Sequence, residues 1–110
     1  MAQGFHVYDA SLALVAALRP VLERLKKSDR GLADQMRRAA SSVALNIAEG
    51  NRRAGQDRLQ FFRIAAGSAA EVRAALQVGQ AWGSIEASPA AEAGLDRVLA
   101  MLWRLTHLRG

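Results

Sequence analysis

The feature that most constrains the fold is a set of apolar residues that recur every three or four positions along four separate segments of the chain. The clearest set lies in the third segment and consists of Phe62, Ala65, Ala69, Val72, Leu76 and Gly79. Because an α-helix turns once every 3.6 residues, this spacing aligns the set along one side of a helix, as at the seam of a helical bundle. No segment shows the strict apolar–polar alternation of a half-buried strand. The sequence therefore predicts an all-α protein.

Three short breaks separate the predicted helices. The first helix is expected over about residues 9–27, the second from a cap at Ser28 or Asp29 to about residue 52, the third from residue 56 or 57 to 82, and the fourth from Ser88-Pro89 onward. Pro20 lies inside the first pattern, where its missing N–H should kink the helix or divide it into two. Gly50 or Asn51 is expected to end the second helix.

The other three helices also carry apolar stripes. The first has Leu14, Leu18, Val21 and Leu25; the second has Leu32, Met36, Ala39, Ala40, Val43 and Ile47; the fourth has Leu95, Val98, Leu102 and Leu105, widened by Leu99, Met101, Trp103 and Leu108. Four such helices joined by short connections form an antiparallel up-down-up-down four-helix bundle. We expect residues 1–110 to form one domain of this kind.

Composition limits the function classes. The chain has 110 residues, of which 51% are hydrophobic, so wholesale disorder is excluded. It has no cysteine, which excludes a thiol nucleophile, a cysteine-ligated zinc site and a disulfide framework. No apolar run approaches the roughly 20 residues that cross a bilayer, and no signal-peptide pattern precedes the first helix. We therefore expect a cytoplasmic protein without a membrane partner.

A second apolar stripe lies on the third helix, on the side away from its core residues. It comprises Ile64, Gly67, Ala74, Val78 and Trp82, and the second helix adds a weaker outward set with Leu45, Ala48 and Ser41. Because one bundle core covers only one side of a helix, the stripe predicts a subunit interface in a homo-oligomer. The alternative is a central third helix that is covered by loops and by the first helix of the same chain.

The net charge of +5 is concentrated in one part of the chain. Residues 19–63 hold 11 basic and 5 acidic side chains, whereas residues 64–110 hold 4 of each. Seven arginines are candidate nucleic-acid contacts: Arg30, Arg37, Arg38, Arg52, Arg53, Arg58 and Arg63. The planar guanidinium group suits bidentate phosphate contacts. Without a base-reading motif, we expect any binding to follow backbone or shape. The alternative is a solvated face with i,i+4 ion pairs, Asp34 with Arg38 and Glu49 with Arg53.

Signals for catalysis are missing from the sequence. His6 and His107 lie near opposite ends of the chain, and we interpret each as a surface or interface histidine. The Glu-x-x-His pairs of di-iron bundles, a phosphate-binding glycine loop and a Gly-x-Ser-x-Gly motif are absent. Asn46, at the edge of the predicted core face, is interpreted as a structural amide that fixes helix register through a cross-helix bond. We therefore expect a protein that is not an enzyme and needs no cofactor or metal.

Two motifs carry a resemblance to a known family. The first runs from Leu32-Ala33-Asp34-Gln35-Met36-Arg37-Arg38-Ala39-Ala40-Ser41-Ser42-Val43 to Asn46-Ile47-Ala48-Glu49-Gly50, and the second is Phe62-Arg63-Ile64-Ala65-Ala66-Gly67-Ser68-Ala69-Ala70-Glu71. Over essentially the whole chain, the sequence resembles the bacterial four-helix-bundle family of proteins encoded by intervening sequences in 23S rRNA genes. The same family includes the accessory variability determinant of diversity-generating retroelements.

The resemblance implies a ring-shaped homo-oligomer, a pentamer in the retroelement members, with no enzyme activity. Its motif positions in this chain are Gln35, Arg38, Asn46, Glu49, Gly67, Ser68 and Glu71. The retroelement members bind nucleic acid and associate with a reverse transcriptase. Two functions are therefore expected: contact with RNA or DNA through the arginines, or a scaffold that docks a protein such as a reverse transcriptase without nucleic acid.

Overall fold

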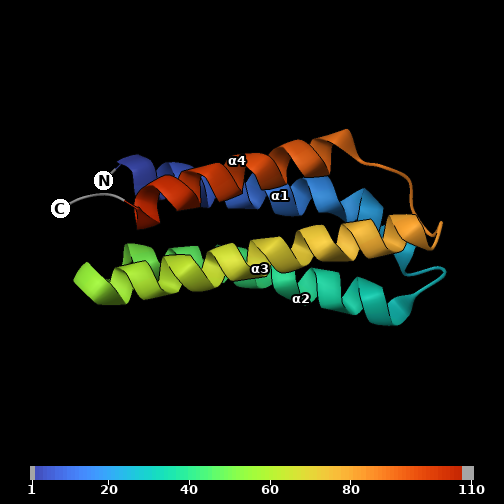
Figure 1. Ribbon diagram of the computed structural model, residues 1–110, viewed down its shortest axis with the longest axis horizontal. Helices are drawn as coiled ribbons and strands as arrows, with labels where there is room; N and C mark the ends of the chain where they lie inside the picture. The colour runs from blue at the N-terminus through green and yellow to red at the C-terminus, as the bar shows by residue number, and fades with distance from the viewer. Residues whose placement is uncertain (1, 108–110) are drawn as a thin grey trace.

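The chain folds into four α-helices. The computed structural model describes the backbone of residues 2–107 and the side chains of residues 6–107. The helices are α1 (Ala2–Leu25), α2 (Arg30–Asn51), α3 (Gly55–Ala81) and α4 (Pro89–Thr106). They run antiparallel along a body of 45 × 22 × 19 Å (Figure 1). The predicted all-α, up-down-up-down bundle is confirmed.

Each helix packs against two neighbours. α2 packs against α1 and α3, and α4 packs against the same two helices, so α2 and α4 occupy opposite corners of the bundle. The α1–α2 and α3–α4 connections lie at one end of the bundle, and the tight α2–α3 turn lies at the other end, beside the last turn of α4 (Figure 1). The outer side of each helix, away from its two neighbours, is thus open to solvent or to another molecule.

The core is built from the predicted stripes. The largest fully buried side chains are Phe62, Leu14, Leu18, Leu25, Met36, Ile47, Leu95, Leu102, Val7, Val43, Val72 and Val98. All six residues of the predicted α3 seam are buried. The α3–α4 connection adds Ile85, which is buried against Gly79 of α3. No periodic pattern marks Ile85, because it lies in a loop.

Two of the predicted helix caps are present. The Asp29 carboxylate accepts a hydrogen bond of 3.0 Å from the Leu32 N–H at the start of α2. The Ser88 hydroxyl accepts one of 3.3 Å from the Ala91 N–H, with Pro89 in the first turn of α4. These side chains satisfy N–H groups that have no partner inside the helix, and they place the two helix starts where the sequence predicts them.

The predicted boundaries of the first helix are wrong. α1 begins at Ala2 rather than near Asp9, because Val7 already packs in the core, and it ends at Leu25, before the turn at residues 26–28. Pro20 does not divide it into two helices. Pro20 and Ala16, whose carbonyl loses its usual amide donor, are both exposed, so water can satisfy that carbonyl.

α2 ends at Asn51, one of its two predicted ends, and Gly50 lies inside its last turn. Gly50 is a site of close approach between α2 and α3. A Cβ atom at Gly50 would lie 2.6 Å from Cε1 of Phe62. Only a residue without a side chain allows the buried Phe62 ring to reach this depth, and the ring holds the two helices together beside their short connection.

Trp103 corrects another prediction. The sequence placed it on the widened apolar face of α4, but its side chain is 61% exposed. Leu99, Met101 and Leu105 do pack against the core, as expected, whereas Leu108 lies outside the described residues. Trp103 instead lines a surface hollow beside Arg63 and Ala66 of α3.

Among the described residues, no helix is both long and apolar enough to span a bilayer.

Candidate functional site

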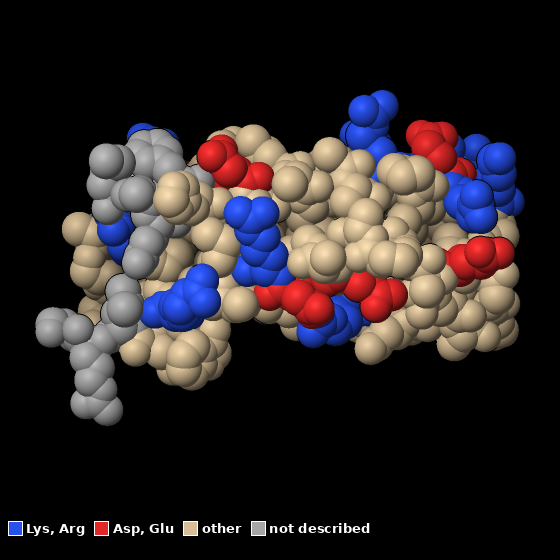
Figure 2. All heavy atoms as spheres, turned by 90° about the horizontal axis from the view of Figure 1, so that it is seen from above, with Lys and Arg blue, Asp and Glu red and all other residues tan. Residues whose placement is uncertain are grey.

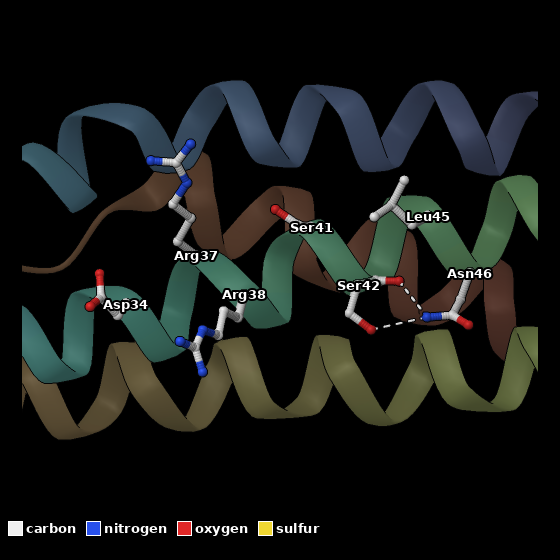
Figure 3. Close-up of a pocket in the computed structure, with 7 residues that line it drawn as sticks. All are labelled: Asp34, Arg37, Arg38, Ser41, Ser42, Leu45 and Asn46. Atoms are coloured by element: carbon white, nitrogen blue, oxygen red, sulfur yellow. Dashed lines mark hydrogen bonds between the residues drawn. The ribbon is translucent and has the colours of Figure 1, made fainter.

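The outer face of α2 carries the first candidate site. Its residues surround an open hollow of about 570 Å³ and are Asp34, Arg37, Arg38, Ser41, Ser42, Leu45 and Asn46. Arg37 extends toward α1 and Arg38 toward α3, and Leu45 lies a few turns further along the same face (Figure 3). The two guanidinium groups thus flank a surface of small polar side chains.

Arg37 and Arg38 are both exposed. Within residues 6–107, no ion pair involves either guanidinium group. The expected i,i+4 pair between Asp34 and Arg38 is not formed, and their side chains lie apart in Figure 3. These two arginines therefore keep their hydrogen-bond donors available for an anionic ligand.

A polar link between α2 and α3 forms one wall of the hollow. The Ser42 and Ser68 hydroxyl groups lie 2.8 Å apart, and the Asn46 amide donates to the Ser42 carbonyl at 2.9 Å and to the Ser42 hydroxyl at 3.0 Å. The expectation that Asn46 itself bonds across helices is wrong. Ser42 makes the crossing, and Asn46 orients it. Of the predicted motif positions, Asn46 and Ser68 take part in this link between α2 and α3.

Arg52, Arg53 and Arg58 have a different environment at the α2–α3 turn. Arg53 pairs with Glu49 at 2.9 Å and lies over the Phe61 ring, 5.1 Å from its centroid. Arg58 donates to the Gly50 carbonyl at 3.2 Å and to the Asn51 carbonyl at 3.3 Å. The expected Glu49–Arg53 pair is present, so the turn uses at least two of these arginines to hold itself together.

Arg52 is more loosely held, with its guanidinium group 3.7 Å from Glu49 and its side chain 79% exposed. Arg30 is exposed at the first residue of α2, and Arg63 is exposed on α3, near the end of α4. Since α2 is about 33 Å long, its first and last arginines cannot meet in one pocket. The seven candidates thus form no single site: Arg37 and Arg38 flank one hollow, and three others surround the turn.

The outward stripe of α3 is uncovered in this chain. Val78 is 44% exposed and Trp82 is 75% exposed, while Ile64, Gly67 and Ala74 are also exposed. Leu45 on α2 is exposed as well. The alternative that loops and α1 of the same chain cover this stripe is therefore wrong. What covers the stripe, if anything, must come from another molecule.

Four further candidate residues lie at the surface. The motif residues Gln35 and Glu71 are exposed, and His6 is exposed on α1. His107 stacks on Trp103. Within the described part of the chain, no group of three His, Asp or Glu side chains is arranged to hold a metal ion.

These observations define an all-α, four-helix bundle with one arginine-bearing face and one uncovered apolar face. The family model described as 23S rRNA-intervening sequence protein matches residues 3–104, and the chain belongs to this family. No curated protein matches the sequence.

The fold has a solved counterpart. The chain is similar to the crystal structure of a protein with unknown function from the S23 ribosomal protein family of Bacteroides thetaiotaomicron VPI-5482. The match has a TM-score of 0.86 at 17% identity and covers 96% of this chain and 99% of that one. At this identity the match supports the fold and no more.

Proposed function

We propose that the protein is a non-enzymatic, basic homo-oligomer that contacts the backbone of RNA or DNA through the outer face of α2. The observation that carries this proposal is the pair of exposed arginines, Arg37 and Arg38, that form no ion pair with the described carboxylates. Two adjacent guanidinium groups can each bind a phosphate in bidentate geometry. The surrounding surface of α2 offers no aromatic base-reading group, so contact is expected to be independent of base sequence.

Self-association extends the proposal. The exposed Val78 and Trp82 favour packing of α3 against a second copy of the chain, because solvent-exposed apolar stripes are small on monomers. A ring, of five protomers if the family resemblance extends to assembly, would repeat the α2 face around one axis. Repeated weak contacts on one polyanion then add to a strong one. Light scattering at micromolar concentration tests this part, since a monomer would contradict it.

Binding to RNA at increasing salt tests the nucleic-acid contact. Affinity for a single-stranded RNA and for a structured RNA should fall steeply as salt rises, since binding releases counterions. The double variant Arg37→Ala/Arg38→Ala should weaken binding to all sequences alike. On a single strand, its salt slope should be shallower by about 0.7 for each phosphate that the two arginines neutralise in the wild type.

The matched control removes two other exposed arginines, Arg24 and Arg97, which also form no ion pair with the described residues. It changes the net charge equally but leaves the α2 face intact. If both double variants lose the same affinity, only total charge matters and the α2 site is refuted. An affinity that ignores salt, or no binding at low salt, rejects the nucleic-acid function altogether.

A second candidate function is a protein scaffold that docks a partner such as a reverse transcriptase. Exposed Leu45, which lines the same hollow as the two arginines, favours it, because an apolar side chain adds nothing to a phosphate contact. Capture of the partner after nuclease treatment distinguishes the two functions. A complex that survives nuclease and is lost in Leu45→Ser supports the scaffold.

A further inference from the structure

A second hollow lies between α3 and the last two turns of α4, with a volume of about 530 Å³. It is lined by Arg63, Ala66, Leu99, Trp103, Thr106 and His107. Unlike the hollow on α2, it contains no carboxylate among its lining residues. Its walls combine an apolar floor, one guanidinium group and two aromatic rings, and the function proposed above uses none of them.

The two rings are already ordered as a stack. The Trp103 and His107 ring centroids lie 4.2 Å apart, and the ring planes differ by 13°. His107 Nδ1 lies 2.8 Å from the Trp103 carbonyl oxygen. A carbonyl oxygen can only accept, so Nδ1 carries a hydrogen and donates it. This bond fixes the imidazole ring over the indole ring, and the pair loses little freedom when a third flat group is added.

The stack lies near the α2–α3 turn, which carries Arg52, Arg53 and Arg58. The end of α4 lies at the same end of the bundle as the α2–α3 turn (Figure 1). That turn carries Arg52 with its largely exposed side chain, and Arg63 follows on α3 between the turn and the stack. By contrast, the face formed by α1 and α4 mixes acidic and basic side chains over most of its length (Figure 2). A strand that follows the basic side chains past the turn therefore meets the aromatic pair next.

We propose that the Trp103–His107 stack is a base-binding platform for single-stranded nucleic acid, with Arg63 holding the adjacent phosphate. Aromatic side chains accept any base on their faces, so the platform needs no sequence preference. Because no carboxylate lines this hollow, it favours a polyanionic ligand over a basic peptide. This inference rests on the proposed nucleic-acid function. To the backbone contact it adds a contact with the bases and a preference for unpaired strands.

The platform is distinct from the uncovered stripe of α3. Arg63 and Ile64 are consecutive on α3, and consecutive helical residues point about 100° apart. Arg63 faces the α4 side, where it lines this hollow. A ring assembled through the stripe can therefore leave the platform open, so both proposals can hold in the same molecule.

The test uses two polyanions, an unstructured 12-mer of deoxythymidine and an inorganic polyphosphate of similar length. Trp103→Ala should weaken binding of the 12-mer about tenfold at fixed salt without changing the salt slope, because stacking releases no counterions. The same variant should bind polyphosphate as the wild type does. Trp103→Phe keeps an aromatic face and should recover most of the affinity for the 12-mer.

A matched pair of single-tryptophan proteins gives an independent signal. Trp82→Phe leaves Trp103 as the only tryptophan, and Trp103→Phe leaves Trp82, which lies in the α3 stripe at the other end of the bundle. Addition of the 12-mer should quench fluorescence in the first protein and leave it unchanged in the second. Circular dichroism and light scattering of each variant report whether helices and assembly are intact.

The outcomes separate the two proposals. If the wild-type protein binds neither probe, the nucleic-acid function fails and the platform fails with it. If it binds both probes with a steep salt dependence but Trp103→Ala changes neither, backbone contact stands and the platform is refuted. Equal weakening of both probes by Trp103→Ala also refutes the platform, because polyphosphate has no base to stack.

Discussion

The outward faces of α2 and α3 differ although the two helices are packed side by side. The α2 face presents arginines and small polar side chains around a hollow, and the α3 face presents Ile64, Ala74, Val78 and Trp82. Between them runs the Ser42–Ser68 link, and its Ser42 end also lines the hollow on α2. The difference teaches that one helical hairpin can serve two purposes at once, because its inner sides satisfy the fold and its outer sides are free to differ. The following changes test this division.

The largest effect is expected from a charge in the α3 stripe. Val78→Asp should dissociate the assembly completely while helicity is retained, because a carboxylate cannot be desolvated in an apolar interface without a partner. Light scattering measures the mass and circular dichroism the helicity. The matched control is Leu12→Asp, since Leu12 on α1 is 45% exposed and Val78 is 44% exposed, but Leu12 lies outside the stripe. Equal dissociation by both variants would contradict the α3 stripe as the interface between copies of the chain.

On the inner side of α2, Gly50→Ala should lower the free energy of unfolding by about 1–3 kcal/mol. The added Cβ would lie 2.6 Å from the buried Phe62 ring, so the ring or the helix must shift. Chemical denaturation of the wild type and the variant checks this value. An unchanged midpoint would mean that α2 and α3 approach less closely than the structure indicates.

The link between the helices should contribute less. Ser42→Ala and Ser68→Ala should each cost about 1 kcal/mol, since each breaks the bond between the two half-buried hydroxyl groups. The double variant should cost less than the sum of the two single variants, and a double-mutant cycle from denaturation curves measures the difference. Strict additivity would show that the two hydroxyl groups do not interact in solution.

The smallest effect, and the one with opposite sign, is expected at Gly67. A Cβ atom there meets nothing within 4 Å in the protomer, so Gly67→Ala should stabilise an unassembled protomer by about 0.5–1 kcal/mol through helix propensity. Measured in the Val78→Asp background, this gain should appear in full. In the assembled protein it should shrink or reverse if a second copy packs closely against Gly67. The same gain in both backgrounds would place Gly67 outside the interface.

The sequence predicted the fold well because burial follows helical periodicity. The α3 seam, the Asp29 and Ser88 caps and the uncovered α3 stripe all follow from spacing and local chemistry alone. Helix boundaries were less accessible where no cap or break marks them, as at the start of α1. For the same reason, Ile85 could not be recognised as a core residue.

The candidate site was predicted only in part. Spacing correctly predicts that Arg37 and Arg38 lie on an outer face. It does not show which arginines form ion pairs or hydrogen bonds within the chain. Glu49 pairs with Arg53, whereas Asp34 forms no ion pair with Arg38, although both pairs have the same spacing. The sequence predicts Trp103 on the widened apolar face of α4, because spacing does not separate the edge of a stripe from its buried centre. The structure instead leaves Trp103 61% exposed.

The cross-section of the bundle, 22 × 19 Å, has a consequence for any assembly of protomers that pack side by side. Equivalent residues on adjacent copies then repeat at about that distance, which spans about six base pairs of a duplex with a rise of about 3.4 Å. The thickness of the protomer, set by its alanine-rich helix packing, thereby acts as a ruler. It determines which phosphates along a nucleic-acid chain a row of identical arginines can reach together.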